Sequence, residues 1–200
     1  MVWQDEFERH YEEAMRRCAS GGNVQSAVDY IKSITDEDHR NFTLSRIAVH
    51  LARLRQADAA ALARDVGEAH GRAIALRDVA REFARQGATA EPRVLLAEAE
   101  RVAEGIPHST WETPTVLLGV SVELHNLAES ADALRVLRRA VGLAQGVATG
   151  DFDAAKTLGG ASVLLSSWGY PEEARSVAES IPQERLRKYT LDRLARPPKS

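Results

Sequence analysis

The chain has 200 residues, a formal net charge of -3 and one cysteine, Cys18. This charge gives no general attraction to nucleic acid or to an anionic membrane surface, and a lone cysteine excludes an internal disulfide and a cysteine-based zinc site. The apolar runs are far shorter than the roughly 20 residues of a membrane-spanning helix, and the charged start, with Asp5 and Glu6, lacks the apolar segment of a signal peptide. We therefore expect a soluble, cytoplasmic protein.

Amphipathic helices fill the chain. Apolar residues recur at steps of three and four, as at Leu76, Val79, Ala80 and Phe83, and no useful stretch alternates with the period of two that strands require. In chain order, the predicted helices span 4–20, 24–34, 39–54, 57–68, 71–86, 90–104, 112–127, 131–146, 152–167, 171–180 and 184–195. We expect Asp38, Ser130 and Asp151 to cap helices, and Pro171 to lie in a first turn.

The first ten helices pair into five hairpins around short turns. The expected turn residues are separated by 33, 32, 41 and 41 residues; they are Gly22, Arg55, Gly87, Ala128 and Gly169. A small residue precedes the last four turns by seven places, and these residues are Ala48, Ala80, Ser121 and Ser162. Five places after the turns come Ala27, Ala60, Pro92, Ala133 and Ala174. Small side chains at fixed positions let two helices cross closely, so the repeat predicts an α-solenoid.

Two connections, 105–114 and 146–151, are longer than the others and account for the two intervals of 41 residues. The repeat phase continues across both of them. We therefore predict one domain over 1–196, followed by a disordered tail at 197–200 that contains Pro197 and Pro198.

This pattern resembles the tetratricopeptide repeat over nearly the whole chain. The resemblance is carried by the small residue, the turn residue and the later alanine, and it is best at Ala80 with Gly87 and at Ser162 with Gly169 and Ala174. It implies an all-α, right-handed α-solenoid of about five antiparallel helix hairpins plus a C-terminal helix. It also implies a non-catalytic scaffold whose first helices hold a peptide, a helix or a partner domain in a concave groove.

The family pattern places groove-facing residues 13, 10, 6, 3 and 2 positions before each turn. In this chain these positions are rich in cations and carry one acid, Glu12. The predicted partner-binding residues are Arg53, Arg77, Arg81, Arg85, His125, Asn126 and Lys156. We interpret them as a groove for an acidic peptide or a C-terminal carboxylate. The alternative is a solvated face whose arginines pair internally.

The stripe Arg77, Arg81 and Arg85 repeats every four residues, so its like charges repel unless acids compensate them. Apolar residues at other groove positions, such as Leu118 and Val122, would suit an amphipathic helix as a partner.

Other residues give no sign of chemistry. The six histidines lack metal-ligand spacing, and no strand–turn–helix elbow or phosphate-binding glycine loop is present, so we expect no catalytic residues, no metal and no cofactor. Arg40, Arg72 and Arg187 recur near the start of first helices, where we expect ion pairs with the preceding hairpin.

Trp168 is expected to cover a hairpin end, and Trp111 and Trp3 are further large anchors. The alternative function is a self-associating structural or regulatory module that docks through its terminal hairpins, as a homodimer or in a complex. The apolar residues Trp3, Leu191 and Leu194 near the two ends suggest it. The net charge and the lack of repeated base-reading side chains argue against a nucleic-acid partner.

Overall fold

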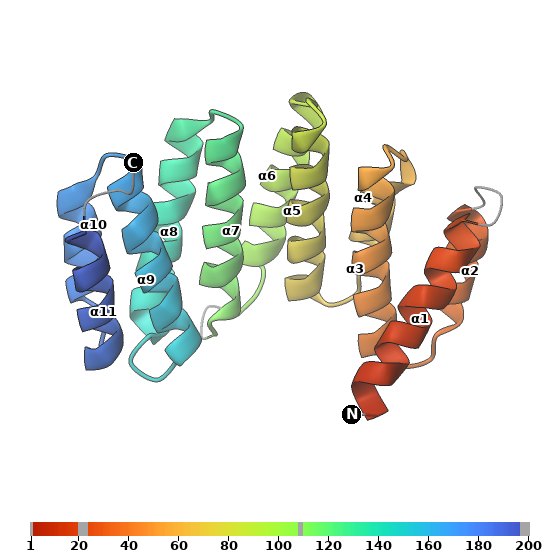
Figure 1. Cartoon of the computed structure of the whole chain (residues 1–200), viewed down its shortest axis with the longest axis horizontal. Coiled ribbons are helices and arrows are strands. Elements are labelled where there is room, and N and C mark those ends of the chain that lie inside the picture. The colour runs from red at the N-terminus through yellow and green to blue at the C-terminus, as the bar shows by residue number, and fades with distance from the viewer. Residues whose placement is uncertain (1, 20–23, 108–109, 197–200) are drawn as a thin grey trace. The chain divides into compact units, whose positions relative to one another are not determined.

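The computed structural model describes residues 2–19, 24–107 and 110–196, which form eleven α-helices and no strand (Figure 1). The helices are α1 (Val2–Ala19), α2 (Val24–Ser33), α3 (Glu37–Arg53), α4 (Asp58–Arg64), α5 (Ala69–Arg85), α6 (Ala90–Glu104), α7 (Glu112–Asn126), α8 (Ser130–Val147), α9 (Phe152–Ser167), α10 (Pro171–Glu179) and α11 (Glu184–Leu194). The predicted all-α class is confirmed. The expected turn at Gly22 and the expected tail at 197–200 lie outside the described residues. No helix in the described part of the chain is long and apolar enough to cross a bilayer.

The helix boundaries follow the sequence periodicity closely except at the end of α4. This helix ends at Arg64 rather than at 68. The backbone N–H of Gly67 instead donates to the side-chain oxygen of Asn41 in α3, at 2.9 Å. A β-carbon at Gly67 would lie 3.2 Å from a carboxylate oxygen of Glu37. A close contact with α3 therefore turns the chain out of the helix before the periodic pattern ends.

The chain divides into two compact units, Met1–Val102 and Ala103–Ser200. In the first unit α1 packs on α2 and α3 on α4, and in the second α7 packs on α8 and α9 on α10. First helices also pack on one another, α3 on α5 in the first unit, and α7 on α9 and α9 on α11 in the second. The sequence-based prediction of one domain over 1–196 stays a prediction.

The small residues expected at helix crossings are buried. Those seven places before the turns are completely inaccessible: Ala48, Ala80, Ser121 and Ser162. Most of those five places after the turns are inaccessible too: Ala27, Ala133 and Ala174. The hydroxyl of Ser162 donates to the Leu158 carbonyl in its own helix, at 2.8 Å, so this polar side chain is satisfied inside the core. Small residues at these positions thus let the helices approach.

Four of the turn residues identified in the sequence, those after α3, α5, α7 and α9, adopt a left-handed conformation. Their φ angles are 58° at Arg55, 86° at Gly87, 62° at Ala128 and 92° at Gly169. At Gly87, the N–H of the turn residue donates to the Ala84 carbonyl and the N–H of Ala88 donates to the Phe83 carbonyl. The same two hydrogen bonds recur at the other three turns, which makes each a Schellman motif that satisfies carbonyls at the helix end.

The recurring arginines do not form the predicted ion pairs. Each donates from its guanidinium to the carbonyl six residues earlier: Arg40 to Ile34 at 3.0 Å, Arg72 to Val66 at 3.2 Å and Arg187 to Ile181 at 3.0 Å. These carbonyls lie just beyond the ends of α2, α4 and α10, where no further turn of helix supplies an N–H. The arginine therefore completes the hydrogen bonding of the connection, a role that sequence spacing alone did not distinguish from an ion pair.

Side-chain hydrogen bonds join successive hairpins within each unit. In the first unit, Arg64 of α4 makes a bidentate contact with Glu98 of α6. In the second, Arg138 of α8 makes one with Glu173 of α10. The amide of Gln183 donates to the Ala148 carbonyl at 2.9 Å. The two ion pairs therefore join the second helices of neighbouring hairpins in both units.

The predicted helix caps are correct in part. Asp151 accepts hydrogen bonds from the N–H groups of Asp153 and Ala154, and Pro171 occupies the first turn of α10. The cap of α3 is Asp36 rather than Asp38, and Ser130 lies inside α8 rather than at its cap. Both errors arise because several polar residues precede these helices and spacing does not select among them.

Replacing Ala128 by glycine is expected to stabilise the second unit by about 0.5–1 kcal/mol, because alanine carries β-carbon strain at φ 62° that glycine lacks. The opposite change at the equivalent turn, Gly169→Ala, is expected to destabilise by about 1 kcal/mol. Nothing lies within 4 Å of a β-carbon there, so the cost is conformational. Urea unfolding measures both, with exposed Ala131→Gly as the control for glycine in a helix. A loss of stability in Ala128→Gly would contradict this account of the turn.

The ion pair between Arg138 and Glu173 predicts a pH dependence. The Arg138 guanidinium lowers the pKa of Glu173 below its ordinary value of 4.5, since hydrogen bonding favours the carboxylate. The unfolded chain then binds this proton more tightly, so the stabilisation is present above pH 4.5 and is lost as the pH falls through the folded pKa. Because the pair is partly exposed, Glu173→Gln should cost only about 0.5 kcal/mol at neutral pH.

Urea unfolding of the wild type and Glu173→Gln between neutral and acidic pH measures this difference. Glu172→Gln, in the same first turn of α10, is the matched control because both carboxylates experience the same helix terminus. A Glu173→Gln difference that persists unchanged in acid would show that the ion pair is not its cause.

Candidate functional site

The predicted arginine stripe lies on one side of α5, and α3 adds a fourth arginine beside it. Arg77, Arg81 and Arg85 are spaced by four residues and therefore share a helix face. Their side chains become more exposed toward the end of the helix: 19% for Arg77, 32% for Arg81 and 65% for Arg85. Arg53, at the end of α3, is 60% exposed. We call these four residues the arginine face.

The first acid within this face is Asp78, which two arginines share. Arg77 donates to one Asp78 oxygen from both Nε and Nη2, at 3.0 and 2.8 Å. Arg81 contacts the same oxygen at 3.2 Å. Only 20% of the Asp78 side chain is exposed. This mostly buried carboxylate therefore pairs with two neighbouring guanidinium groups.

The second acid is Glu82, and it connects the two helices. Its Oε1 lies 3.5 Å from Arg53 of α3 and 3.2 Å from Arg85 of α5. The Glu82 side chain is only 7% exposed, whereas both arginines are mostly exposed. The Glu82 carboxylate is thus buried, and the guanidinium groups of Arg53 and Arg85 are exposed to solvent.

These contacts explain how the like charges of the stripe coexist. Helix α5 contains four arginines and two acids, and the two acids lie one position after Arg77 and Arg81. The compensating carboxylates therefore come from the same helix. Both acids are visible in the sequence directly after Arg77 and Arg81, but neither lies at a groove-facing position. Because each acid is shared, pairing reduces the repulsion without removing the basic character of the face.

Hydrogen bonds from the Gln86 side chain to the backbone of α3 join the ends of α3 and α5. The side-chain amide of Gln86 donates to the Ala52 carbonyl at 2.8 Å and to the Arg53 carbonyl at 3.3 Å. These carbonyls belong to the last turn of α3, so the amide also satisfies groups that the helix leaves open. Gln86 directly follows Arg85, and the contact therefore fixes the spacing of Arg53 and Arg85.

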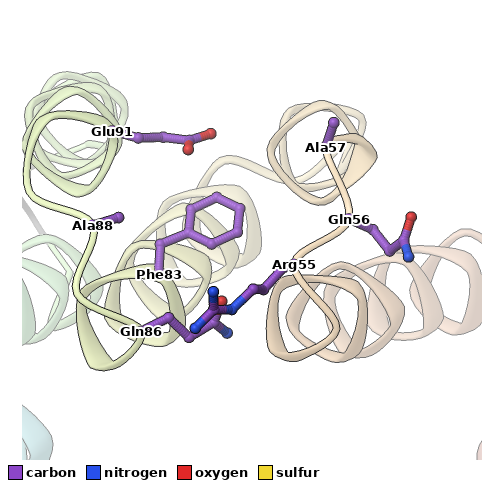
Figure 2. A pocket seen from close by; sticks show the side chains of 7 residues that line it. All are labelled: Arg55, Gln56, Ala57, Phe83, Gln86, Ala88 and Glu91. Atoms are coloured by element: carbon purple, nitrogen blue, oxygen red, sulfur yellow. The ribbon is translucent and has the colours of Figure 1, made fainter.

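A pocket opens beside this end of the arginine face, and we call it the turn pocket (Figure 2). Its volume is about 350 Å³, and it is lined by Arg55, Gln56, Ala57, Phe83, Gln86, Ala88 and Glu91. Figure 2 shows the Phe83 ring in the middle, the Glu91 carboxylate on the α6 side and the Arg55 chain running toward Gln86. The Arg55 side chain makes no hydrogen bond or ion pair with another described residue and adds a further cation next to the face.

The predicted residues of the second unit do not form one cluster. His125, near the end of α7, stacks on Trp168 with ring centroids 4.3 Å apart. Asn126 donates to Glu123 at 3.2 Å, and Lys156 pairs with Asp153 at 2.7 Å near the start of α9. Lys156 lies ten positions further from its turn than His125 does, which is roughly 15 Å along parallel helices.

The tryptophans are placed in part as expected. Trp168 follows α9 directly and packs against the apolar core of the second unit, which confirms that it covers the end of this hairpin. Trp111 packs against the same core. The Trp3 side chain lies outside the described residues.

Among the described residues, no group of three or more histidine, cysteine, aspartate and glutamate side chains is placed to hold a metal ion. The single cysteine, Cys18, is half-buried, and burial raises the pKa of its thiol, which disfavours the reactive thiolate. The arginine face is therefore the candidate site that the described side chains offer.

Comparison with known proteins supports the fold alone. No family model and no curated protein sequence matches the chain. Among solved structures, the chain is similar to the crystal structure of Ton1535 from Thermococcus onnurineus NA1, with a TM-score of 0.53 and 17% sequence identity. The match covers 92% of this chain and 53% of that one, so the chain spans about half the length of Ton1535. At this identity the likeness concerns the all-helical architecture.

Proposed function

We propose that this chain is a tetratricopeptide-like, right-handed α-solenoid that forms one domain over 1–196. Two observations support the repeat. The same Schellman motif ends the first helix at four of the expected turns, and a bidentate ion pair joins the second helices of neighbouring hairpins in each unit. A stack of hairpins joined in this way offers its first helices as one extended surface.

We further propose that the protein is a non-catalytic scaffold that binds an acidic peptide or an acidic segment of a partner protein. The observation that carries this proposal is the arginine face, in which two recessed carboxylates are each shared by two arginines. A guanidinium has five N–H donors, and the contacts to Asp78 and Glu82 use one or two of them on each arginine. Arg53 and Arg85 can therefore reach ligand carboxylates without giving up their present partner.

The expected affinity from charge is modest. An exposed ion pair contributes about 0.5 kcal/mol, so four of them supply about 2 kcal/mol, or roughly a 30-fold gain in affinity. Backbone hydrogen bonds and apolar contacts on the first helices must provide the rest. Because the charges are exposed, the electrostatic part should weaken as salt rises.

Charge reversal tests the arginine face. The double variant Arg77→Glu/Arg81→Glu should bind a fluorescent peptide of about ten alternating Glu and Asp residues at least about tenfold more weakly than the wild type. Fluorescence anisotropy at about 50 and 200 mM salt measures this loss and its salt dependence. Peptides with a free or an amidated C-terminus distinguish a terminal carboxylate from acidic side chains as the recognised group.

The control for this experiment is Arg135→Glu/Arg139→Glu, because these arginines have the same four-residue spacing on the second helix α8 and are about half exposed. Circular dichroism confirms that each variant is folded, and Arg77→Gln/Arg81→Gln replaces the reversed pair if it is not. Equal binding by the Arg77/Arg81 variant and its control would remove the arginine face from the proposal.

The second candidate function is self-association through the C-terminal hairpin. It is favoured by a cavity of about 460 Å³ at the end of α11, whose lining includes Leu191, Leu194 and Glu172. Thr190 is the one buried residue of α11, and Tyr189 beside it is 62% exposed. Helix α11 thus packs on α9 and α10, with Leu194 against the apolar core, and leaves the Tyr189 side chain exposed.

Sedimentation equilibrium tests this candidate. If the protein self-associates through this hairpin, the wild type should be a dimer and Leu191→Asp/Leu194→Asp should be a folded monomer. Tyr170→Ser is the control and should remain a dimer, because Tyr170 is exposed at a turn outside this cavity. A wild-type monomer at high concentration would exclude it.

A further inference from the structure

Helix α1 is held to its unit by few buried apolar groups. Among its described side chains, only Phe7 and Ala14 are buried. Most other positions of the helix carry charged or polar residues. Each polar contact that α1 makes with α2 and α3 therefore has a large share in keeping it docked.

The polar contact to α2 is made by His10. Its Nδ1 lies 2.7 Å from the hydroxyl oxygen of Tyr30. The Tyr30 ring is in turn covered by the Arg17 guanidinium of α1, which lies 4.5 Å from the ring centroid. His10 thus sits at the meeting point of α1 and α2, half-buried, with a hydrogen bond to the neighbouring helix.

A second histidine faces His10 from α3. His39 is only 4% exposed, and its ring centroid lies 5.7 Å from that of His10. The Phe7 ring of α1 meets the His39 ring edge-on at 4.2 Å. Two imidazoles and an aromatic ring therefore form part of the contact between α1 and α3, with His39 buried and His10 half-buried.

We propose that this histidine pair makes the docking of α1 sensitive to acid: protonation of His10 beside His39 weakens the contact of α1 with α2 and α3 and releases the helix. A charge on His10 lies beside the His39 ring, and the half-buried site solvates that charge poorly. The released state is favoured because the His10 imidazolium is then fully hydrated.

The charged groups around His10 come from all three helices, and they do not cancel this effect. Helix α1 contributes Glu6 and Arg9, α2 contributes the Tyr30 hydroxyl, and α3 with its cap contributes His39 and Asp36. Burial, Arg9 and His39 lower the pKa of His10 below 6.5, and this outweighs the opposing carboxylates of Glu6 and Asp36. Because the free histidine binds its proton more tightly, the docked state loses stability as the pH falls below 6.5.

Release of α1 would change the binding surface of the first unit. The Phe7 ring contacts Phe42 of α3, with centroids 4.6 Å apart. Phe42 is already 41% exposed and lies at one of the groove-facing positions of its hairpin. Undocking of α1 removes Phe7 from it and adds an aromatic contact area to the helix that also carries Arg53. This inference rests on the contacts of α1 and not on the proposed ligand of the arginine face.

Hydrogen exchange at several pH values tests the proposal in the full chain. After correction for the intrinsic pH dependence of exchange, protection of α1 should fall several-fold between about pH 7.5 and 5.5, with about tenfold as the upper limit for one histidine whose free pKa is about 6.5. Protection of α9 should stay constant over the same range. Equal loss in α1 and α9, or no loss in α1, would overturn the proposal.

Two glutamine variants separate the histidines. His10→Gln keeps a hydrogen-bonding group near Tyr30 and removes the titration, so α1 protection should become nearly independent of pH. His50→Gln is the matched control, because His50 is also a half-buried histidine whose pKa is lowered, by burial and by Arg53, on α3. It should retain the wild-type behaviour of α1. The same pH dependence in His10→Gln as in the wild type would refute the role of His10.

A measurement on the wild type keeps the proposal testable if His10→Gln fails to dock α1 at any pH. The titration of the His10 ring, followed by NMR through its Cε1–H signal, should coincide with the loss of α1 protection. Titration of His10 with α1 still protected would show that the charge is tolerated and would overturn the proposal.

Discussion

The left-handed residue after α3, α5, α7 and α9 is the constraint on which the rest of the structure depends. At this one position the chain leaves the first helix and two carbonyls of the helix end are satisfied before the second helix begins. The small residues seven places before these turns, and the alanines five places after them, are buried because the turn determines which face of each helix points to the core. Arg55 and Ala128 adopt this conformation without being glycine, so the packing of the hairpin outweighs the local strain at two of the four turns.

Contacts between hairpins complete this arrangement with polar groups that are periodic in the sequence. Arginines near the start of α3, α5 and α11 bind the carbonyls of the preceding connection. Bidentate ion pairs join α4 to α6 and α8 to α10. Exposed pairs of this kind contribute little stability each, but their fixed geometry favours one register of neighbouring hairpins over others. The apolar core supplies the free energy of folding, and these groups select how the hairpins are aligned.

The arginine face combines both requirements. Its outer charges would repel on an isolated helix, and its recessed acids let them stay on a packed helix with their guanidinium groups still exposed. His10 and His39, at the contact of α1 with α3, are the contrasting case, because their half-buried site solvates a charge poorly. The first unit thus combines a surface whose arginine charges are compensated by buried acids with a helix contact that, in our proposal, protonation of His10 weakens.

The sequence by itself determined the helices, the turn positions and the buried small residues, because all of them depend on local periodicity and on backbone conformation. Gly87 and Gly169, and the alanines five places after the turns, could be read without any tertiary contact. Only the tertiary structure decided that Asp78 and Glu82 are shared between arginines, that Arg72 binds a carbonyl instead of an acid, and that His10 faces His39. Several partners are compatible with the spacing of each of these side chains, and packing between helices selects one of them. For the same reason the early end of α4, which depends on the contact of Gly67 with α3, was not predictable from the periodic pattern.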